Sequence, residues 1–520
     1  MTSEAETSSE PKDLSVGGQI AILLAASTYP TFAIWANNPL EFPHPMRLVL
    51  ISGAIFVLTV LLTVVTRRLG AMRWAAASGG IVWALTLGLG GPIAARIGVP
   101  LTLLAGAVTG ALIVVLMTRL RTNQAARYPI IVVSCILGFG PLGPLAGDLL
   151  AQTAGAELNV PDSPYTSALE ERPDIFLIVV DGFIGLDGSR EVFGESQPSW
   201  AQKLVTLGFD VPASGWASYP ITIASVPSLF EMDYPIEADV PGSRAVISAL
   251  IDKMGGSNRL VSTLNASGYH TTMMEAGWSW SHCGGEYDVC VPSAFLDEGT
   301  YRVLLRSIAG PDLMDRWPSA FTLGASHAMS WMLEELWLEG PDSQPRFFFG
   351  HVMAPHPPLY LTGDCQIAND AERAGVLLDN GRTDLQRRKE LYLEQAECVT
   401  EFLVEFTSRA DANDVLIFVA DHGSDSTNQL IKPGTQWTEA DTRERLSSMV
   451  AVRAGRHCDL GETVVLPNIV RAVLDCVALE TPTPQVEVRM FSGGLRLGGE
   501  TDTLEELTPS DVERIVGDGT

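Results

Sequence analysis

Three short apolar runs in the chain are each followed by residues that can bind a metal ion or carry a proton. The runs and these residues are IFLIVV (175–180) before Asp181, FFFG (347–350) before His351 and His356, and VLIFVA (415–420) before Asp421 and His422. In open α/β sheets, ligands bind beyond the carboxyl ends of the strands, so these side chains are expected to share one edge of a sheet. A single Asp after a strand is often only a turn former, but three such ends favour a common site.

The sequence Asp-His-Gly at 421–423 is the sharpest of these elements. Adjacent Asp421 and His422 side chains can face one cation where the strand ends, and Gly423 permits the turn that this requires. Oxygen and imidazole ligands suit Zn²⁺ or Mn²⁺, whereas Ca²⁺ or Mg²⁺ is less natural beside a histidine. We therefore predict a bound divalent metal ion. The alternative is a strand end capped by Asp beside a surface His.

The segment 219–230, YPITIASVPSLF, places hydroxyl groups ahead of an expected helix start. A Thr or Ser at this position can act as a nucleophile once a metal ion activates it, and a helix N-terminus favours the anionic group under attack. By composition alone, N-capping is the simpler interpretation of Thr222 and Ser225. The segment therefore leaves two roles open for these hydroxyls.

The elements that must position these residues are short strands alternating with helices. Each of the three runs is continuously apolar, as expected of strands buried on both faces of a largely parallel sheet. Helical stretches lie between them, for example at 384–408. We therefore predict an α/β sandwich with a largely parallel central sheet. After about residue 480 the chain is acidic and contains prolines, and LTPSDVERIV then predicts at most a short capped helix.

The first 150 residues predict a membrane domain. Five apolar runs, at about 18–36, 47–66, 72–92, 99–118 and 129–150, each approach the ~20 residues that cross a bilayer core. If all five span, the basic loops at 67–73 and 119–127 lie on the same side, which the positive-inside rule makes cytoplasmic. The chain after residue 150 is then outside. A cleaved signal peptide is the alternative for the first run, but only Lys12 precedes it among several acids.

The sequence therefore divides into five parts of a multi-pass protein of the cell membrane. These are a cytoplasmic tail (1–16), a five-helix transmembrane domain (17–150), a linker (151–172), an exported catalytic domain (173–480) and an acidic C-terminal tail (481–520). After residue 150 the chain has 55 acidic and 25 basic residues. So acidic a domain argues against nucleic acid as a partner, because the phosphate backbone would be repelled.

Six of the seven cysteines follow residue 150, and an even number in an exported domain indicates disulfides. Proximity in the sequence favours Cys283 with Cys290, Cys365 with Cys398, and Cys458 with Cys476. Other pairings, or buried free thiols, remain open.

Four motifs in this order resemble the alkaline phosphatase/sulfatase superfamily. They are VVDGF (179–183), TIASVPSLF (222–230), HVMAPHPP (351–358) and VADHGSDS (419–426). Within the superfamily, the chain most resembles membrane enzymes with five transmembrane helices and an exported catalytic domain, namely lipoteichoic acid synthases and lipid A phosphoethanolamine transferases. The resemblance covers about 173–475 by motif and the membrane part by architecture only.

The resemblance implies an alkaline-phosphatase-like α/β sandwich and a role for each matched residue. It implies Thr222 as the nucleophile and a metal ligand, Asp181, Asp421 and His422 as the other ligands, and His356 as a substrate-binding or proton-donating residue. His351 and Ser225 are possible substrate-binding residues, and His351 either supports His356 or is a structural His at a strand end. The stretch RERLSSMVAV (443–452) is similar to family sequence that supports the site. The two-metal pattern of alkaline phosphatase is incomplete here, which implies one metal ion. His457 is the only His after Asp421-His422 and is interpreted as a surface residue.

The expected function is that of a metal-dependent phosphotransferase or phosphodiesterase that forms a phospho-Thr222 intermediate. Its expected substrate is a lipid head group or an envelope glycan, within reach of a membrane-tethered domain. One alternative is a sulfatase-type ester hydrolase, although the signature Cys/Ser-x-Pro-x-Arg is absent. A second alternative is a non-catalytic metal-binding envelope protein.

Overall fold

The computed structural model describes most of the chain after residue 171. The described residues are 50, 53, 57, 61, 158, 172–194, 198–238, 240, 243–276, 280–292, 323–337, 344–357, 359–367, 385–425, 434–455, 458, 460–478, 485–494 and 504–517. The five expected transmembrane helices, apart from four isolated helical positions, and His457 lie outside them. In the described part of the chain, no helix is both long and apolar enough to cross a membrane.

The chain divides into two compact units, Met1–Leu150 with Thr300–Met314, and Ala151–Gly299 with Asp315–Thr520. The second unit is built on a six-stranded sheet in the order β4-β3-β5-β1-β6-β7. Its strands are β1 (Ile175–Val180), β3 (His270–Met274), β4 (Val289–Val291), β5 (Arg346–Val352), β6 (Val415–Val419) and β7 (Val450–Arg453). All neighbours are parallel except β6 and β7. The predicted α/β domain with a largely parallel sheet is confirmed.

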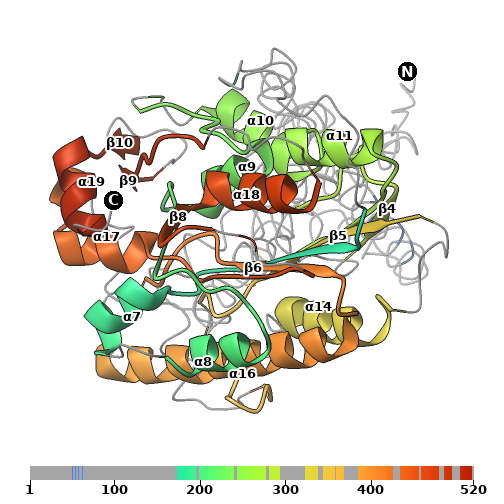
Figure 1. Ribbon diagram of the computed structural model, residues 1–520, viewed down its shortest axis with the longest axis horizontal. Helices are drawn as coiled ribbons and strands as arrows, with labels where there is room; N and C mark the ends of the chain where they lie inside the picture. The colour runs from blue at the N-terminus through green and yellow to red at the C-terminus, as the bar shows by residue number, and fades with distance from the viewer. Residues whose placement is uncertain are drawn as a thin grey trace, which may run out of the picture. The chain divides into compact units, whose positions relative to one another are not determined.

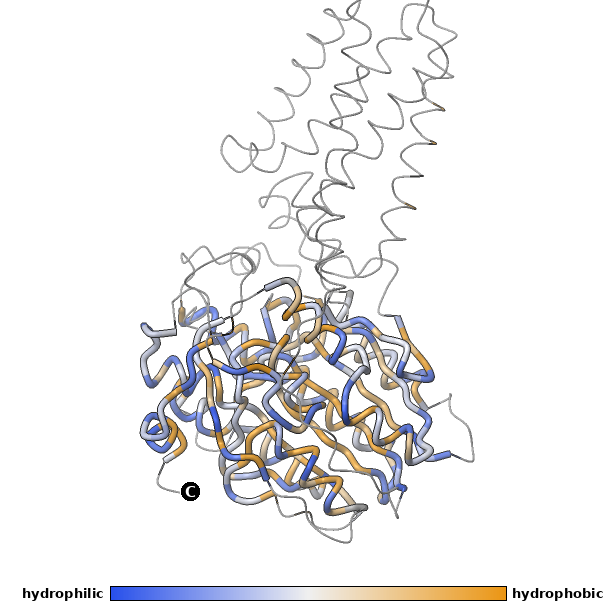
Figure 2. The backbone as a smooth tube through the Cα atoms, turned by 90° about the horizontal axis from the view of Figure 1, so that it is seen from above, coloured by the Kyte–Doolittle hydropathy of each residue, from blue (hydrophilic) through white to orange (hydrophobic). Residues whose placement is uncertain are grey.

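Helices cover both faces of this sheet (Figure 1). One face carries α9 (Thr222–Glu231), α10 (Arg244–Met254), α11 (Arg259–Ala266) and α18 (Leu466–Ala478), and the other carries α8 (Ser199–Thr206), α14 (Leu323–Glu334) and α16 (Leu385–Arg409). Hydrophobic stretches run through the middle of the unit (Figure 2). Phe406 of α16 packs its ring edge-on against Phe176 and Phe418, with centroids 5.8 and 6.0 Å apart. Full burial of such a side chain stabilises the fold by about 1.5–3 kcal/mol.

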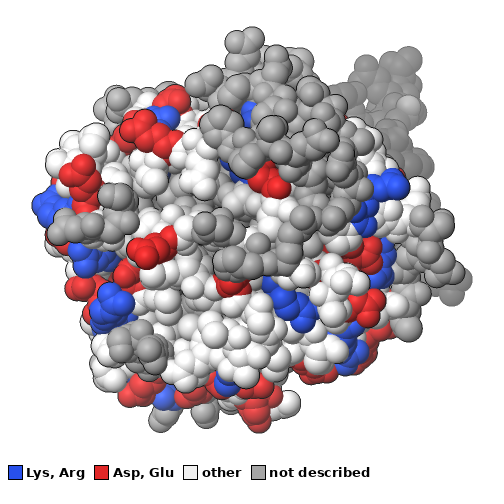
Figure 3. Space-filling model, viewed as in Figure 1, with Lys and Arg blue, Asp and Glu red and all other residues white. Residues whose placement is uncertain are grey.

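Charged side chains of both signs are interspersed on the face seen in Figure 3. Between α8 and α16, Lys203 Nζ lies 2.5 Å from Glu397 and 2.6 Å from Glu401. These partly exposed pairs join the two helices, but each contributes at most about 1 kcal/mol because water screens them.

The C-terminal segment contributes small elements that pack on the second unit. They are the antiparallel β9 (Phe491–Gly493) and β10 (Leu504–Glu506), followed by α19 (Pro509–Val516), the short capped helix expected from the sequence. Arg489 pairs with both Glu237 and Glu506, and the Phe491 ring stacks on Tyr219 with centroids 4.6 Å apart. These contacts attach the segment to residues on both sides of α9, Tyr219 before it and Glu237 after it.

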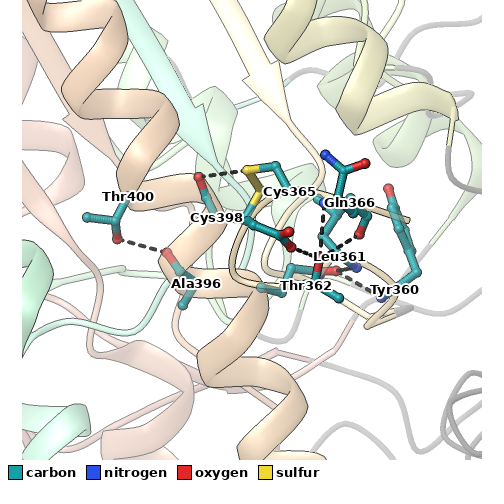
Figure 4. The surroundings of a disulfide bond; sticks show 10 residues. Tyr360, Leu361, Thr362, Cys365, Gln366, Ala396, Cys398 and Thr400 are labelled. Carbon is teal, nitrogen blue, oxygen red and sulfur yellow. Dashed lines mark hydrogen bonds between the residues drawn. A yellow bond between two sulfur atoms is a disulfide. The ribbon is translucent and has the colours of Figure 1, made fainter. Parts of the chain in front are cut away.

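Three disulfides form, between the same cysteines that sequence proximity favoured: Cys283–Cys290, Cys365–Cys398 and Cys458–Cys476. Figure 4 shows that the second joins the loop at 359–367 to α16. Gln395 of α16 adds to this attachment, since its Oε1 accepts from the Tyr360 and Leu361 amides and its Nε2 donates to the His356 carbonyl. The backbone around His356 is therefore held against α16.

Candidate metal and nucleophile site

The carboxyl ends of β5, β1 and β6 lie side by side, because these strands are consecutive in the sheet. His351 of β5 is in register with Val179 of β1, and the Asp181 amide continues the ladder with a 2.9 Å hydrogen bond to the Val352 carbonyl. Val179 is in register with Val419, two residues before Asp421. The three strand ends that the sequence singled out are thus brought to one edge.

A glycine after β1 allows the His356 loop to approach. Gly182 has φ +71°, in the left-handed region that side chains disfavour, and a Cβ there would lie 3.4 Å from the His356 Cα. The His356 amide donates to the Asp181 carbonyl at 2.9 Å, and the buried Tyr392 hydroxyl donates to the Gly182 carbonyl at 2.9 Å. The loop carrying Asp181 is therefore fixed from two sides.

The glycine after Asp421-His422 has a different role from the one expected. Gly423 is not among the residues with positive φ, so the turn itself does not require glycine. A Cβ at this position would lie 2.0 Å from the Glu444 carbonyl and 2.6 Å from that of Ser447. Gly423 is needed because the end of α17 (Glu439–Leu446) packs directly on it.

Thr222 is the first residue of α9, and its hydroxyl does not cap the helix. The N-cap position is Ile221, which offers no side-chain cap. The Thr222 Oγ1 instead lies 3.5 Å from Oδ2 of Asp181 and 3.3 Å from Nε2 of His422. Ser225 is also fully buried, but its hydroxyl donates to the Asp421 carbonyl. Of the two hydroxyls, Thr222 is the one that faces the acidic cluster.

The acidic cluster contains buried atoms that lack hydrogen-bond partners. Ligand atoms of Asp181, His351 and Asp421 lie within 4.8 Å of one another, and each residue is at most 1% exposed. Among the described residues, Asp181 Oδ1, Asp421 Oδ2 and His351 Nδ1 have no hydrogen-bond partner, while His351 Nε2 lies 3.4 Å from Asp181 Oδ2. His422 Nε2 lies 3.6 Å from Asp181 Oδ1 and 3.2 Å from Asp421 Oδ2. Buried polar atoms are normally satisfied, so this set fits a divalent cation.

The electrostatics of the cluster hold its ligands in different protonation states. Burial and the neighbouring Asp181 charge raise the pKa of Asp421 to about 6. Burial acts in the same direction on Asp181, but His356, His351 and His422 outweigh it and lower the pKa of that carboxyl. Burial, then the positive charge of Arg445, lowers the pKa of His422 well below its usual value. An ionised Asp181 and a neutral His422 are the forms that ligate metal.

Arg445, in the last turn of α17, is a site residue that the sequence did not reveal. Its Nη2 lies 3.0 Å from Nε2 of His422, and since a guanidinium only donates, that nitrogen accepts; its one lone pair can serve either this bond or a metal ion. The His422 Nδ1 then carries the proton and donates to the Gly423 carbonyl at 2.9 Å. The only sequence signal was the family-like stretch 443–452, in which no residue stood out.

His356 lies at the margin of the cluster and is partly exposed. Its ring centroid is 6.1 Å from that of His422, and its Nδ1 donates to the Pro357 carbonyl at 2.6 Å. This bond leaves Nε2 to face a substrate. The structure thus brings Asp181, Thr222, Asp421 and His422 together, with His351 among them rather than beside His356.

Residues 203–446 match the family model described as Sulfatase. No curated protein sequence matches the chain. Solved structures that are similar include the following three. The zinc complex of the C-terminal periplasmic domain of EptC from Escherichia coli is 10% identical, with 66% of this chain and 94% of that chain covered and a TM-score of 0.40. The lipooligosaccharide phosphoethanolamine transferase A from Neisseria meningitidis is 12% identical, with 89% and 95% covered and a TM-score of 0.41. A 2-O GAG sulfatase is 9% identical, with 62% and 78% covered and a TM-score of 0.37. Similarity at this level does not indicate a shared substrate.

Proposed function

The domain that includes residues 203–446 is a sulfatase-type domain of the alkaline phosphatase/sulfatase superfamily, and we propose that the protein is a membrane-anchored, metal-dependent phosphotransferase or phosphodiesterase. The observation that carries this proposal is the position of Thr222. A hydroxyl at a helix start, 3.5 Å from Asp181 and 3.3 Å from His422 in a buried cluster, has the surroundings of an activated nucleophile.

Asp181, Asp421, His422 and Thr222 would hold the metal ion, and His351, whose Nδ1 has no hydrogen-bond partner among the described residues, is a further candidate ligand. When bound, a divalent ion lowers the pKa of the hydroxyl and neutralises charge on phosphoryl oxygens. Zn²⁺ or Mn²⁺ suits this mixed oxygen and nitrogen set, while Ca²⁺ or Mg²⁺ suits it less.

In the proposed reaction, the Thr222 hydroxyl passes its proton to Asp181 Oδ2, 3.5 Å away, and attacks the phosphorus of an ester, so that a Thr222 Oγ–P bond forms as the bond to the leaving oxygen breaks. The N-terminus of α9 favours the anionic group at that position. His356, entering this step with a proton on each ring nitrogen, delivers the Nε2 proton to the leaving oxygen, because its Nδ1 is engaged by Pro357. A water or sugar hydroxyl then displaces Thr222, which makes the protein a hydrolase or a transferase respectively.

We propose a lipid head group or an envelope glycan as the substrate. The five apolar runs before residue 150 support a membrane tether with the catalytic domain outside. A tethered domain meets lipid-linked substrates at a high effective concentration.

Sulfate-ester hydrolysis is the second candidate, and the match to the sulfatase family model favours it. Two features speak against it. The position of the signature Arg is occupied by Leu229, and Ser225, at the signature's first position, donates its hydroxyl to the Asp421 carbonyl.

The test is mass spectrometry of the full-length protein after reaction with bis(p-nitrophenyl) phosphate or p-nitrophenyl sulfate in the presence of Zn²⁺. We expect a phosphoryl adduct on Thr222 from the first ester, absent in Asp421→Ala and retained in Ser225→Ala. An adduct on Ser225 or Ser228 would overturn the choice of nucleophile. Turnover of the sulfate ester alone would replace the proposed reaction by the second candidate.

A further inference from the structure

Three buried residues on one face of α16 contact the loops that follow β1 and β5. They are Tyr392, Gln395 and Cys398, spaced three residues apart. The Tyr392 hydroxyl accepts from the Ile184 amide and donates to the Gly182 carbonyl, each at 2.9 Å. Cys398 is joined by its disulfide to Cys365. The helix therefore supports the two loops at once.

Gln395, the middle residue of this face, bonds directly to the backbone of His356. Its Nε2 donates to the His356 carbonyl at 3.1 Å, and its Oε1 accepts from the Tyr360 and Leu361 amides at 2.9 and 3.0 Å. The side chain is completely buried. These bonds hold the loop after β5 at two points, one of which is His356 itself.

The partners of Gln395 require a donor and an acceptor on one neutral side chain. Two amides face its Oε1 and a carbonyl faces its Nε2, which is the combination that a carboxamide supplies. Buried backbone groups that lose such a partner are unfavourable, because water does not reach them in place. Without the carboxamide, the loop is therefore expected to shift until its polar groups find new partners.

Both backbone polar groups of His356 are bonded inside the protein. Its amide donates to the Asp181 carbonyl at 2.9 Å, and its carbonyl accepts from Gln395. Its ring donates from Nδ1 to the Pro357 carbonyl, so Nε2 is the atom left to meet a substrate. A general acid must lie within hydrogen-bond reach of the leaving oxygen, and a misplacement of about 1 Å can cost 10²-fold in rate. The bonds to the His356 backbone therefore bear on proton transfer.

We propose that Gln395 is a positioning residue, which holds the His356 ring where its Nε2 reaches the leaving oxygen. Gln395 acts through the His356 backbone and touches no reacting atom. The proposal rests on the proposed function, in which His356 protonates that oxygen. It predicts that Gln395 matters for esters whose leaving oxygen needs a proton and matters little for esters that release a stable anion.

The test uses full-length Gln395→Met, which keeps the length of the side chain and makes none of the three bonds. With Zn²⁺ present, release of phenol from diphenyl phosphate is compared with release of p-nitrophenol from bis(p-nitrophenyl) phosphate. Phenolate is the poorer leaving group and depends more on a proton. We expect kcat/KM to fall about 10–100-fold for diphenyl phosphate and less than about 3-fold for the p-nitrophenyl ester.

The matched control is Thr400→Val, on the same helix. Thr400 is buried, and its hydroxyl donates to the Ala396 carbonyl within α16, as Figure 4 shows, so this variant should keep wild-type rates with both esters. A second comparison uses a His356→Gln background, in which no acid remains to be positioned. Gln395→Met should cause no further loss there, whereas a general disturbance of the site would lower the rate in both backgrounds.

A readout without turnover is the NMR signal of the His356 ring in histidine-labelled protein, identified by its loss in His356→Gln. The signal should move in Gln395→Met and keep its place in Thr400→Val. An unmoved signal would overturn the proposal, as would equal losses for the two esters or an undiminished loss in the His356→Gln background.

If Gln395→Met does not fold, Gln395→Glu decides by the same comparisons, since its carboxylate accepts from both amides and does not donate to the His356 carbonyl. A wild type that forms no Thr222 adduct from either ester would refute the proposed reaction, and the NMR signal would then decide whether Gln395 positions His356. An adduct in the wild type with equal losses for both esters in the variant would refute the role of Gln395 alone.

Discussion

The three central strands, β5, β1 and β6, have charged residues at both of their ends. We call the line of amino ends the amino edge of the sheet and the line of carboxyl ends the carboxyl edge, and the charged residues at the two edges differ in how they are paired. At the amino edge, Asp174 precedes β1, Arg346 begins β5 and Asp414 precedes β6. The backbone amide and Nε of Arg346 both donate to Asp174, each at 2.7 Å, and Asp414 accepts from the Asp411 amide at 2.7 Å. The Arg346–Asp174 pair joins β5 to β1, and Asp414 is bonded within the turn that precedes β6.

At the carboxyl edge, Asp181, His351 and Asp421 retain atoms without a hydrogen-bond partner among the described residues. Both β1 and β6 thus have one Asp before the strand and one after it. In each case only the Asp after the strand, Asp181 or Asp421, lies in a cluster whose atoms lack hydrogen-bond partners among the described residues. Polar groups left in this state lower the stability of the fold, and proteins keep them where a ligand supplies the missing partner. The contrast indicates that the amino edge has a structural role and that the carboxyl edge binds a ligand.

The largest expected difference between the edges is in metal binding. Asp421→Asn removes a ligand charge, and we expect at least about a 100-fold loss of zinc affinity, since even residues that only orient ligands are worth 10–100-fold. Asp414→Asn, the matched change on the same strand, should leave affinity unchanged. Calorimetric titration with Zn²⁺ measures both. Equal affinities in the two variants would remove the distinction between the edges.

The second difference is in the stability of the zinc-free protein. At pH 8 Asp421 is ionised beside Asp181 although burial opposes this, so Asp421→Asn should raise the free energy of unfolding by about 1 kcal/mol. Asp174→Asn weakens the partly exposed ion pair with Arg346. This change should lower the free energy of unfolding by about 1 kcal/mol. Urea unfolding with EDTA present provides the values. Shifts of the same sign would contradict the comparison.

The sequence predicted three strands of the sheet, β1, β5 and β6, because continuous apolar runs identify buried strands, and it gave no such signal for β3, β4 or β7. The run 175–180 coincides with β1, and the run 415–420 extends one residue beyond β6. The order β5-β1-β6 could not be read from the sequence, since it depends on pairing between segments far apart in the chain. That order is what turns three separate strand ends into one site.

The burial of Arg445 was also beyond the sequence. Its helix, EADTRERL, is almost entirely polar and resembles a solvent-exposed helix, and only the packing of its end on Gly423 buries the guanidinium. The role of His351 could not be predicted from the sequence either, because a His at a strand end can have a structural or a functional role. Its place beside Asp181 and its Nδ1 without a hydrogen-bond partner among the described residues became visible only with the fold.

The smallest expected difference is in the pH dependence of stability. Burial and the nearby Asp174 raise the pKa of Asp414 to about 6, although the bond from the Asp411 amide opposes this. The folded protein therefore holds this proton more tightly than the unfolded chain, whose Asp titrates near 4. Stability from this group is complete below about pH 4 and is lost as the pH rises through about 6.

Asp414→Asn should remove this loss, so that between pH 4 and 8 the unfolding free energy of the zinc-free variant falls less than that of its parent. Because Asp414 is partly solvated, we expect a difference below about 1 kcal/mol. Asp421 titrates in the same range, so the comparison belongs in an Asp421→Asn background, where Asp421 no longer contributes and the other groups of the carboxyl edge act alike in parent and variant. A parent and variant with parallel pH profiles in that background would show that Asp414 is paired as well as Asp174, and that the amino edge holds no strained carboxyl at all.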